Sequence, residues 1–233
     1  MRFPLRFLAI LLPLFAPLAP QLRAEPALVT AADPFAKWEK EIAAFEAKDR
    51  ENPPQKGGIV FVGSSSIRKW VTLAEDFPHH RVLNRGFGGS QIIDSVHFAD
   101  RIVLPYEPRM VVLYAGGNDI HAGKSPEQVF ADFQAFVEKI RAKLPKTEIA
   151  CISIAGNPAR WDEVEKVKAL NAMIESYIKG QEGMKFINVF PRMLASDGLP
   201  RPEIFVADRL HMNAEGYKLW TEIVGSYLPA PDR

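Results

Sequence analysis

Three serines, Ser64, Ser65 and Ser66, follow an apolar segment at residues 58–62 and a glycine, at the point where a helical pattern begins. A serine at such a turn can cap the helix, or its hydroxyl can act as a nucleophile. A nucleophilic serine needs a base that removes its proton, a group that orients the base, and preorganised N–H donors for the oxyanion of a tetrahedral intermediate. The nucleophile interpretation therefore requires these groups elsewhere in the chain.

A candidate base stands late in the chain, in the segment DRLH. His211 can accept the serine proton, and Asp208, three residues earlier, can orient the imidazole and stabilise the imidazolium ion. Three N–H donors are available: the backbone N–H of Ser65, the backbone N–H of Gly89 in NRGFGGS, and the side-chain amide of Asn118 in GGND. Together these are the groups that acyl transfer needs.

Short apolar runs alternate with helical patterns over most of the chain. The runs predict strands at residues 58–62, 81–84, 110–115, 148–155 and 185–190. The helical patterns lie at residues 66–76, 91–103, 126–143, 161–179 and 214–227. This alternation predicts one α/β domain with a five-stranded parallel sheet covered by helices on both faces. Because ligands bind beyond the carboxyl ends of such strands, we expect the serine turn, the glycine-rich loop and the Asn-Asp pair at one edge.

The N-terminal part precedes this pattern in two segments. Residues 1–24 have the pattern of a secretory signal peptide: a basic start, an apolar run from Phe7 to about Pro20, and a small residue, Ala24, before the cut. The run is short for a membrane-spanning helix and contains three prolines, so we expect cleavage near Ala24 and a periplasmic or secreted protein without a stable membrane span. Residues 25–57 are expected to form a helix and a linker packed on the domain at residues 58–233. The apolar residues at helical spacing are Phe35, Trp38, Ile42 and Phe45.

The composition excludes several kinds of partner and chemistry. A formal net charge of +1 gives no basic surface for nucleic acid, which favours a small-molecule partner. The only cysteine, Cys151, allows no internal disulfide and is expected to be a buried strand residue. The remaining histidines show no metal-ligand spacing, so no metal site is expected; they are His79, His80, His97 and His121.

Four segments resemble, in order and spacing, the motif blocks of the SGNH (GDSL) hydrolase family: VFVGSSSI, NRGFGGS, YAGGND and DRLHMNAEGY, spread over residues 58–225. The pattern is similar to that of the type I platelet-activating-factor acetylhydrolase catalytic subunits and related bacterial acyl esterases. The resemblance implies a three-layer α/β/α sandwich with flavodoxin-like topology. It also implies that the domain is a carboxylic ester hydrolase that uses no cofactor.

The same resemblance implies a role for each matched residue. Ser65 would be the nucleophile, and Asp208 and His211 would complete a catalytic triad with it. The oxyanion hole would consist of Ser65, Gly89 and Asn118. The chain departs from the family pattern immediately before the nucleophile, where a serine stands in place of the usual aspartate. That aspartate is not the triad acid, so the departure is expected to change the bracing of the turn.

Three functions are open at this point. A secreted serine esterase would hydrolyse short acyl esters, including acetylated carbohydrates, because the chain has no long apolar insertion that could form a lid. An acyltransferase would use the same site to move an acyl group to or from a carbohydrate hydroxyl. A non-catalytic binding module would have no need of the Asp-His pair. Arg85, Asn157 and Arg160 are candidates to face the pocket, whereas Trp70 and Trp161 are expected to pack.

Overall fold

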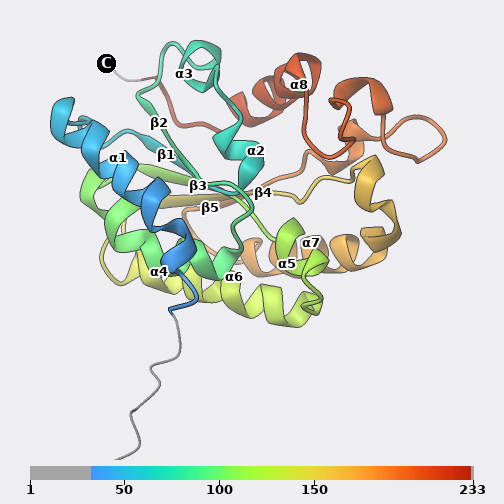
Figure 1. Ribbon diagram of the computed structural model, residues 1–233, viewed down its shortest axis with the longest axis horizontal. Coiled ribbons are helices and arrows are strands. Elements are labelled where there is room, and N and C mark those ends of the chain that lie inside the picture. The colour runs from blue at the N-terminus through green and yellow to red at the C-terminus, as the bar shows by residue number, and fades with distance from the viewer. Residues whose placement is uncertain (1–32, 232–233) are drawn as a thin grey trace, which may run out of the picture. The chain divides into compact units, whose positions relative to one another are not determined.

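Five parallel strands form a single sheet in the computed structural model, which describes residues 33–231. The strands are β1 (Ile59–Gly63), β2 (Val82–Gly86), β3 (Met110–Tyr114), β4 (Glu148–Ile152) and β5 (Met184–Ile187). Their spatial order is β2-β1-β3-β4-β5 (Figure 1). The order reverses at β1, so a ligand crevice is expected beyond the carboxyl ends of β1 and β3. The expected signal peptide over residues 1–24 lies outside the described residues.

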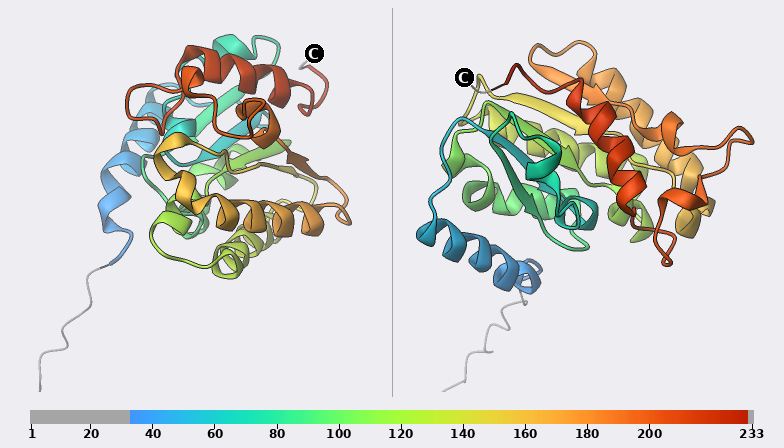
Figure 2. Two further views of the ribbon diagram at one scale, coloured as in Figure 1. Left: turned by 90° about the vertical axis from the view of Figure 1, so that its right-hand side faces the viewer. Right: turned by 90° about the horizontal axis from the view of Figure 1, so that it is seen from above.

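Helices cover both faces of this sheet (Figures 1 and 2). One face carries α1 (Glu39–Glu51), α4 (Ile92–Ile102), α6 (Pro126–Arg141) and α7 (Val164–Ile178). The other face carries α2 (Ser65–Arg68), α3 (Leu73–Asp76) and α8 (Ala214–Gly225), and a short helix, α5 (Gly117–His121), follows β3. The predicted three-layer α/β/α sandwich is therefore confirmed. Within residues 33–231, every helix is too short or too polar to span a bilayer.

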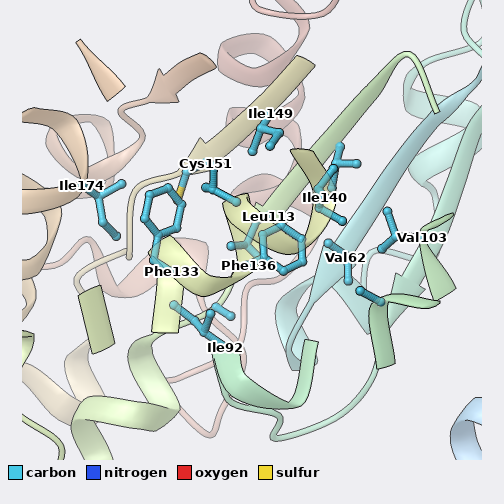
Figure 3. Packing of buried hydrophobic residues seen from close by; sticks show 14 of the residues in the cluster. Val62, Ile92, Val103, Leu113, Phe133, Phe136, Ile140, Ile149, Cys151 and Ile174 are labelled. Carbon is cyan, nitrogen blue, oxygen red and sulfur yellow. The ribbon is translucent and has the colours of Figure 1, made fainter. Parts of the chain in front are cut away.

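Side chains that alternate along each strand divide the core into two clusters. In β1, Val60 and Val62 belong to the cluster under α4 and α6, whereas Ile59 and Phe61 belong to the cluster under α8. Figure 3 shows part of the first cluster, in which Cys151 lies among aliphatic and aromatic side chains. Burial raises the pKa of the Cys151 thiol to about 12, so the expected buried strand residue is confirmed.

The single helix expected over residues 66–76 is wrong, because two short helices, α2 and α3, occupy this stretch. Asn84 of β2 donates its side-chain amide to the carbonyl oxygens of Ile67 and Trp70, at 2.6 and 3.3 Å. A continuous helix would use these carbonyls for its own N–H groups. The amide of Asn84 therefore ends α2 and fixes its position against the sheet.

The strand expected over residues 148–155 ends early, at Ile152. Asn171 of α7 pairs with both backbone groups of Ile154: its Oδ1 accepts the N–H at 2.8 Å, and its Nδ2 donates to the carbonyl at 3.0 Å. A longer strand would have offered these groups to its neighbours. The chain instead leaves the sheet at this point and forms part of the crevice.

Candidate active site

Ser65 lies at the junction of β1 and α2. Gly63 ends β1 with a φ of +140°, and a Cβ at this position would clash with the carbonyl oxygen of Tyr114 in β3, so the turn requires glycine. The carbonyl of Ser64 accepts the N–H groups three and four residues ahead, at 3.0 and 3.1 Å. Backbone groups therefore begin α2, and the Ser64 side chain makes no capping hydrogen bond. The hydroxyl of Ser65 is available for another partner.

A chain of hydrogen bonds joins Ser65, His211 and Asp208. Ser65 Oγ lies 2.9 Å from His211 Nε2, and His211 Nδ1 lies 2.6 Å from Asp208 Oδ2. When Nδ1–H is donated to Asp208, Nε2 presents its lone pair to the serine hydroxyl. The structure thus brings together three residues that the sequence separates by up to 146 positions.

Asp208 is held in its ionised form. Its Oδ1 accepts the backbone N–H groups of His211 and Leu210, both at 2.9 Å. The N–H and the imidazole of His211, together with the N–H of Leu210, hold the pKa of this carboxyl well below its usual range. A carboxylate that stays ionised can orient the imidazole and stabilise the imidazolium ion that forms during proton transfer.

The loop that carries the Asp-His pair is closed at its base by backbone pairing. Val206 donates its N–H to the carbonyl of His211 at 2.9 Å. Within the loop, Arg209 has a φ of +58°, and its carbonyl accepts the N–H of Ala159 at 3.1 Å. The loop is therefore tied to the segment that follows β4.

A cavity of about 40 Å³ lies beside the Ser65–His211 pair. Its polar lining comes from the serine turn and from Asn118, Asn157 and Arg160. Its apolar lining comes from Tyr114, Ile154, Met193, Phe205, Met212 and Trp220. The cavity beside the nucleophile therefore offers both polar and apolar contacts to a substrate.

Asn118 reaches the cavity from the start of α5. Its Nδ2 donates to the carbonyl of Ser90 at 3.0 Å, and its Oδ1 accepts from Arg160 Nη1 at 3.0 Å. These two bonds fix the plane of the amide. The amide nitrogen carries two hydrogens. One is donated to the carbonyl of Ser90, and the other can be donated to an oxyanion.

Gly89 occupies an exposed turn with a φ of +76° and is not among the described residues that line the cavity. It directly precedes Ser90, whose carbonyl accepts the amide of Asn118, so its loop is joined to the site through Ser90. The oxyanion role of the Gly89 N–H stays a prediction. The N–H of Ser65 belongs to the first turn of α2, where N–H groups have no partner within the helix.

Other residues considered from the sequence divide into two groups. Asn157 and Arg160 line the cavity, as the position after β4 suggested. Arg85 does not: it is buried, it forms an ion pair with Asp49, and its Nε donates to the hydroxyl of Tyr106 at 2.9 Å. Arg85 therefore fastens α1 to the sheet instead of facing the cavity.

The remaining aromatic and imidazole groups have structural partners. Trp70 is fully buried, and Trp161 packs against Gly156, where an added Cβ would lie 2.7 Å from its ring. His97 stacks on a phenylalanine, and His121 Nδ1 lies 2.7 Å from a glutamate oxygen. Within residues 33–231, no group of three or more His, Cys, Asp or Glu side chains could hold a metal ion.

No sequence signal predicted the apolar wall of the cavity. The hydroxyl of Tyr114 accepts the N–H of Ala155 at 3.4 Å, and its ring meets Trp220 edge-on with the centroids 4.7 Å apart. Tyr114 is the last residue of β3 and the first residue of the block YAGGND, but the sequence predicted no role for its side chain. Trp220 is a buried residue of α8, and no sequence signal singled it out.

Residues 62–219 match the family of GDSL-like lipases and acylhydrolases. The sandwich with a serine, a histidine and an aspartate at its crevice defines an α/β/α hydrolase, and the family match covers more than half of the chain. The chain belongs to the GDSL-like lipase/acylhydrolase family, and it is a carboxylic ester hydrolase. No curated protein matches the chain.

Solved structures share the fold. A protein from Streptococcus pneumonia, provisionally described as a platelet activating factor, has a TM-score of 0.73 at 20% identity, over 83% of this chain and 94% of its own. A GDSL-like lipase from Bacteroides thetaiotaomicron has a TM-score of 0.66 at 22% identity, over 83% of this chain and 96% of its own. An acetyl xylan esterase has a TM-score of 0.64 at 18% identity, over 73% of this chain and 99% of its own. At these identities the likeness concerns the fold.

Proposed function

We propose that the protein is an exported serine esterase that hydrolyses short-chain acyl esters through an acyl-enzyme on Ser65. The observation that carries the proposal is the hydrogen-bonded chain from Ser65 through His211 to Asp208, beside a cavity of about 40 Å³. The family supports ester hydrolysis in general, which favours a catalytic function over a binding module on the same fold.

The geometry allows a two-step reaction. Ser65 Oγ attacks the ester carbonyl carbon while His211 Nε2 takes the hydroxyl proton, and the oxyanion that forms accepts hydrogen bonds from the proposed donors. The C–O bond to the alcohol then breaks, and the alcohol leaves with the proton from Nε2. Water attacks the acyl-enzyme and gives its proton to Nε2. Release of the carboxylic acid returns that proton to Ser65 Oγ.

The proposed substrate is an ester with a short acyl group, because the cavity beside the nucleophile is small, about 40 Å³. Esters of carbohydrates are included, and the fold shared with an acetyl xylan esterase supports that choice. Transfer of the acyl group to a sugar hydroxyl is the alternative at the same site. It would show as a rate that rises with added sugar, together with an acylated sugar product.

Export rests on the N-terminal pattern of residues 1–24. The measurement is the mass of the mature protein recovered from outside the cytoplasm. A chain that begins after Ala24 supports export, and an intact chain that stays with the cytoplasmic fraction contradicts it.

The test of the catalytic proposal is hydrolysis of p-nitrophenyl acetate and its longer homologues by the wild type and Ser65→Ala. We expect turnover by the wild type, a loss of at least about 1000-fold in kcat in the variant, and a kcat/KM that falls as the acyl chain lengthens. Ser226→Ala removes an exposed hydroxyl of the C-terminal segment and serves as the matched control. Equal values of kcat for Ser65→Ala and Ser226→Ala would show that Ser65 is not the nucleophile.

A further inference from the structure

We propose that Glu41 of α1 is a positioning residue for this reaction, because its carboxylate joins the nucleophile helix to the glycine-rich loop. The inference rests on the proposed function. Glu41 lies outside residues 62–219, which match the family, so the N-terminal helix would add a part to the site that the family match does not contain.

The carboxylate of Glu41 has two partners in two different segments. Its Oε2 accepts the backbone N–H of Gly88 at 3.0 Å. Its Oε1 pairs with Arg68 Nη1 at 3.0 Å. Gly88 directly precedes Gly89, the predicted oxyanion donor, and Arg68 is the last residue of α2, whose first residue is Ser65. One side chain therefore holds both segments at a fixed separation.

The packing around these bonds leaves little room for the loop to move. A Cβ at Gly88 would clash with the guanidinium of Arg68, so this guanidinium lies directly against the loop backbone. Trp38 packs on the residues on either side of Gly88: a Cβ at Gly89 would lie 3.5 Å from its ring, and its ring meets Phe87 edge-on with the centroids 5.5 Å apart. Phe87 and Gly89 thus contact Trp38, and Gly88 contacts Glu41 and Arg68.

The helix itself is anchored independently of the loop. Ile42 is fully buried in the first core cluster, and Glu46 pairs with Arg101 of α4 at 2.7 Å. Farther along α1, Asp49 forms an ion pair with the buried Arg85 of β2. Glu41 therefore projects from a support that is fixed to α4 and to the sheet (Figures 1 and 2).

The energetics separate a positioning role from a stabilising one. The side chains of Arg68 and Glu41 are 47% and 35% exposed, and ion pairs with such exposure contribute little to stability. A displaced oxyanion donor, in contrast, weakens an interaction that exists only in the transition state. Loss of Glu41 should therefore lower kcat much more than it lowers the melting temperature.

Glu46 provides a matched control, because it lies on the same helix and forms the same kind of ion pair, directed to α4 and not to the loop. The experiment compares wild type, Glu41→Ala, Glu41→Gln and Glu46→Ala as full chains on p-nitrophenyl acetate, with Tm for each. We expect Glu41→Ala to lose about 10-fold in kcat, with KM within about twofold, as for a misplaced group remote from the reacting atoms. Glu41→Gln keeps an acceptor for Gly88 N–H and should recover part of the loss.

The outcomes distinguish this inference from the proposed function. A Glu41→Ala rate equal to that of Glu46→Ala, with an active wild type, overturns the positioning role and leaves the esterase proposal intact. A loss of kcat in both variants that follows their Tm values assigns Glu41 a merely structural role. A wild type that neither turns over nor reacts with a fluorophosphonate overturns the esterase proposal and this inference with it. If Glu41→Ala fails to fold, the kcat of Glu41→Gln is compared with that of Glu46→Ala. A lower kcat for Glu41→Gln supports the positioning role, and an equal kcat overturns it.

Discussion

The carboxylate of Asp208 accepts hydrogen bonds from two backbone N–H groups and from the imidazole of His211. Because folding lowers its pKa, the ionised carboxylate stabilises the folded state above the unfolded pKa of about 3.9. That contribution is lost as the pH falls through the lower folded value. Proton binding to this carboxyl therefore does not limit the activity near neutral pH.

Replacement of this carboxylate should separate structure from catalysis. In Asp208→Asn, the amide oxygen can still accept the two N–H groups, but the neutral side chain cannot stabilise the imidazolium ion or select its tautomer. We expect kcat to fall by about 10³- to 10⁴-fold, the size of loss known for the corresponding change in serine proteases. The measurement is kcat on p-nitrophenyl acetate with circular dichroism to confirm the fold.

Asp197→Asn is the matched control, because Asp197 also accepts an N–H two residues ahead and has no imidazole partner in the structure. An Asp208→Asn variant with the same kcat as Asp197→Asn would contradict the triad assignment.

Among the elements, the α2–α3 break shows how a side chain from one strand sets the length of a neighbouring helix. Asn84 satisfies the carbonyls of Ile67 and Trp70 through Nδ2, and its Oδ1 accepts the N–H of Gly86 at 2.9 Å. This one amide therefore holds the end of α2, the helix that begins at Ser65, against β2.

Asn84→Ala removes three side-chain hydrogen bonds, while the carbonyls of Ile67 and Trp70 keep the backbone N–H groups of Trp70 and Leu73 as donors. We expect the free energy of unfolding to fall by about 1–3 kcal/mol, because each lost hydrogen bond has a net contribution of about 0.5–1.5 kcal/mol. Denaturant unfolding measures it, with the exposed Asn188→Ala as the control. Equal stability of the two variants would show that water replaces the amide without cost.

These elements also show what the sequence could and could not predict. Apolar runs located all five strands, and the motif spacing located Ser65, His211 and Asp208, because periodicity and residue type are local signals. The end of α2 depends on a residue 17 positions away, and the contact between Glu41 and Gly88 spans 47 positions. Asn84 and Gly88 belong to the block NRGFGGS, but nothing in the sequence pairs them with α2 or with Glu41, so such contacts follow only from the assembled fold.

At the scale of the whole molecule, the fold is held by its core without a disulfide, since Cys151 is the only cysteine. Cys151 of β4 is 2% exposed, and burial raises the pKa of its thiol to about 12. Below that pH the folded protein keeps the thiol neutral, and the thiolate is the form that reacts.

Cys151 should therefore report global unfolding. At pH 8 without denaturant we expect no stoichiometric reaction with a disulfide reagent such as DTNB, and with denaturant we expect labelling to follow the circular dichroism transition. Rapid labelling of the native protein would contradict the burial of β4. As a control, Cys151→Ser should retain the wild-type kcat on p-nitrophenyl acetate. This result would show that the thiol takes no part in catalysis.

The separation of Ser65 from its base has a consequence for the order in which the chain is made. Synthesis proceeds from the N-terminus, so the serine emerges 146 residues before His211. Helix α8, whose Tyr217 hydroxyl donates to the carbonyl of Ser66 at 2.8 Å, emerges later still. A growing polypeptide thus carries an unactivated serine through most of translation, and nucleophilic reactivity begins only when its last segments have folded onto the sheet.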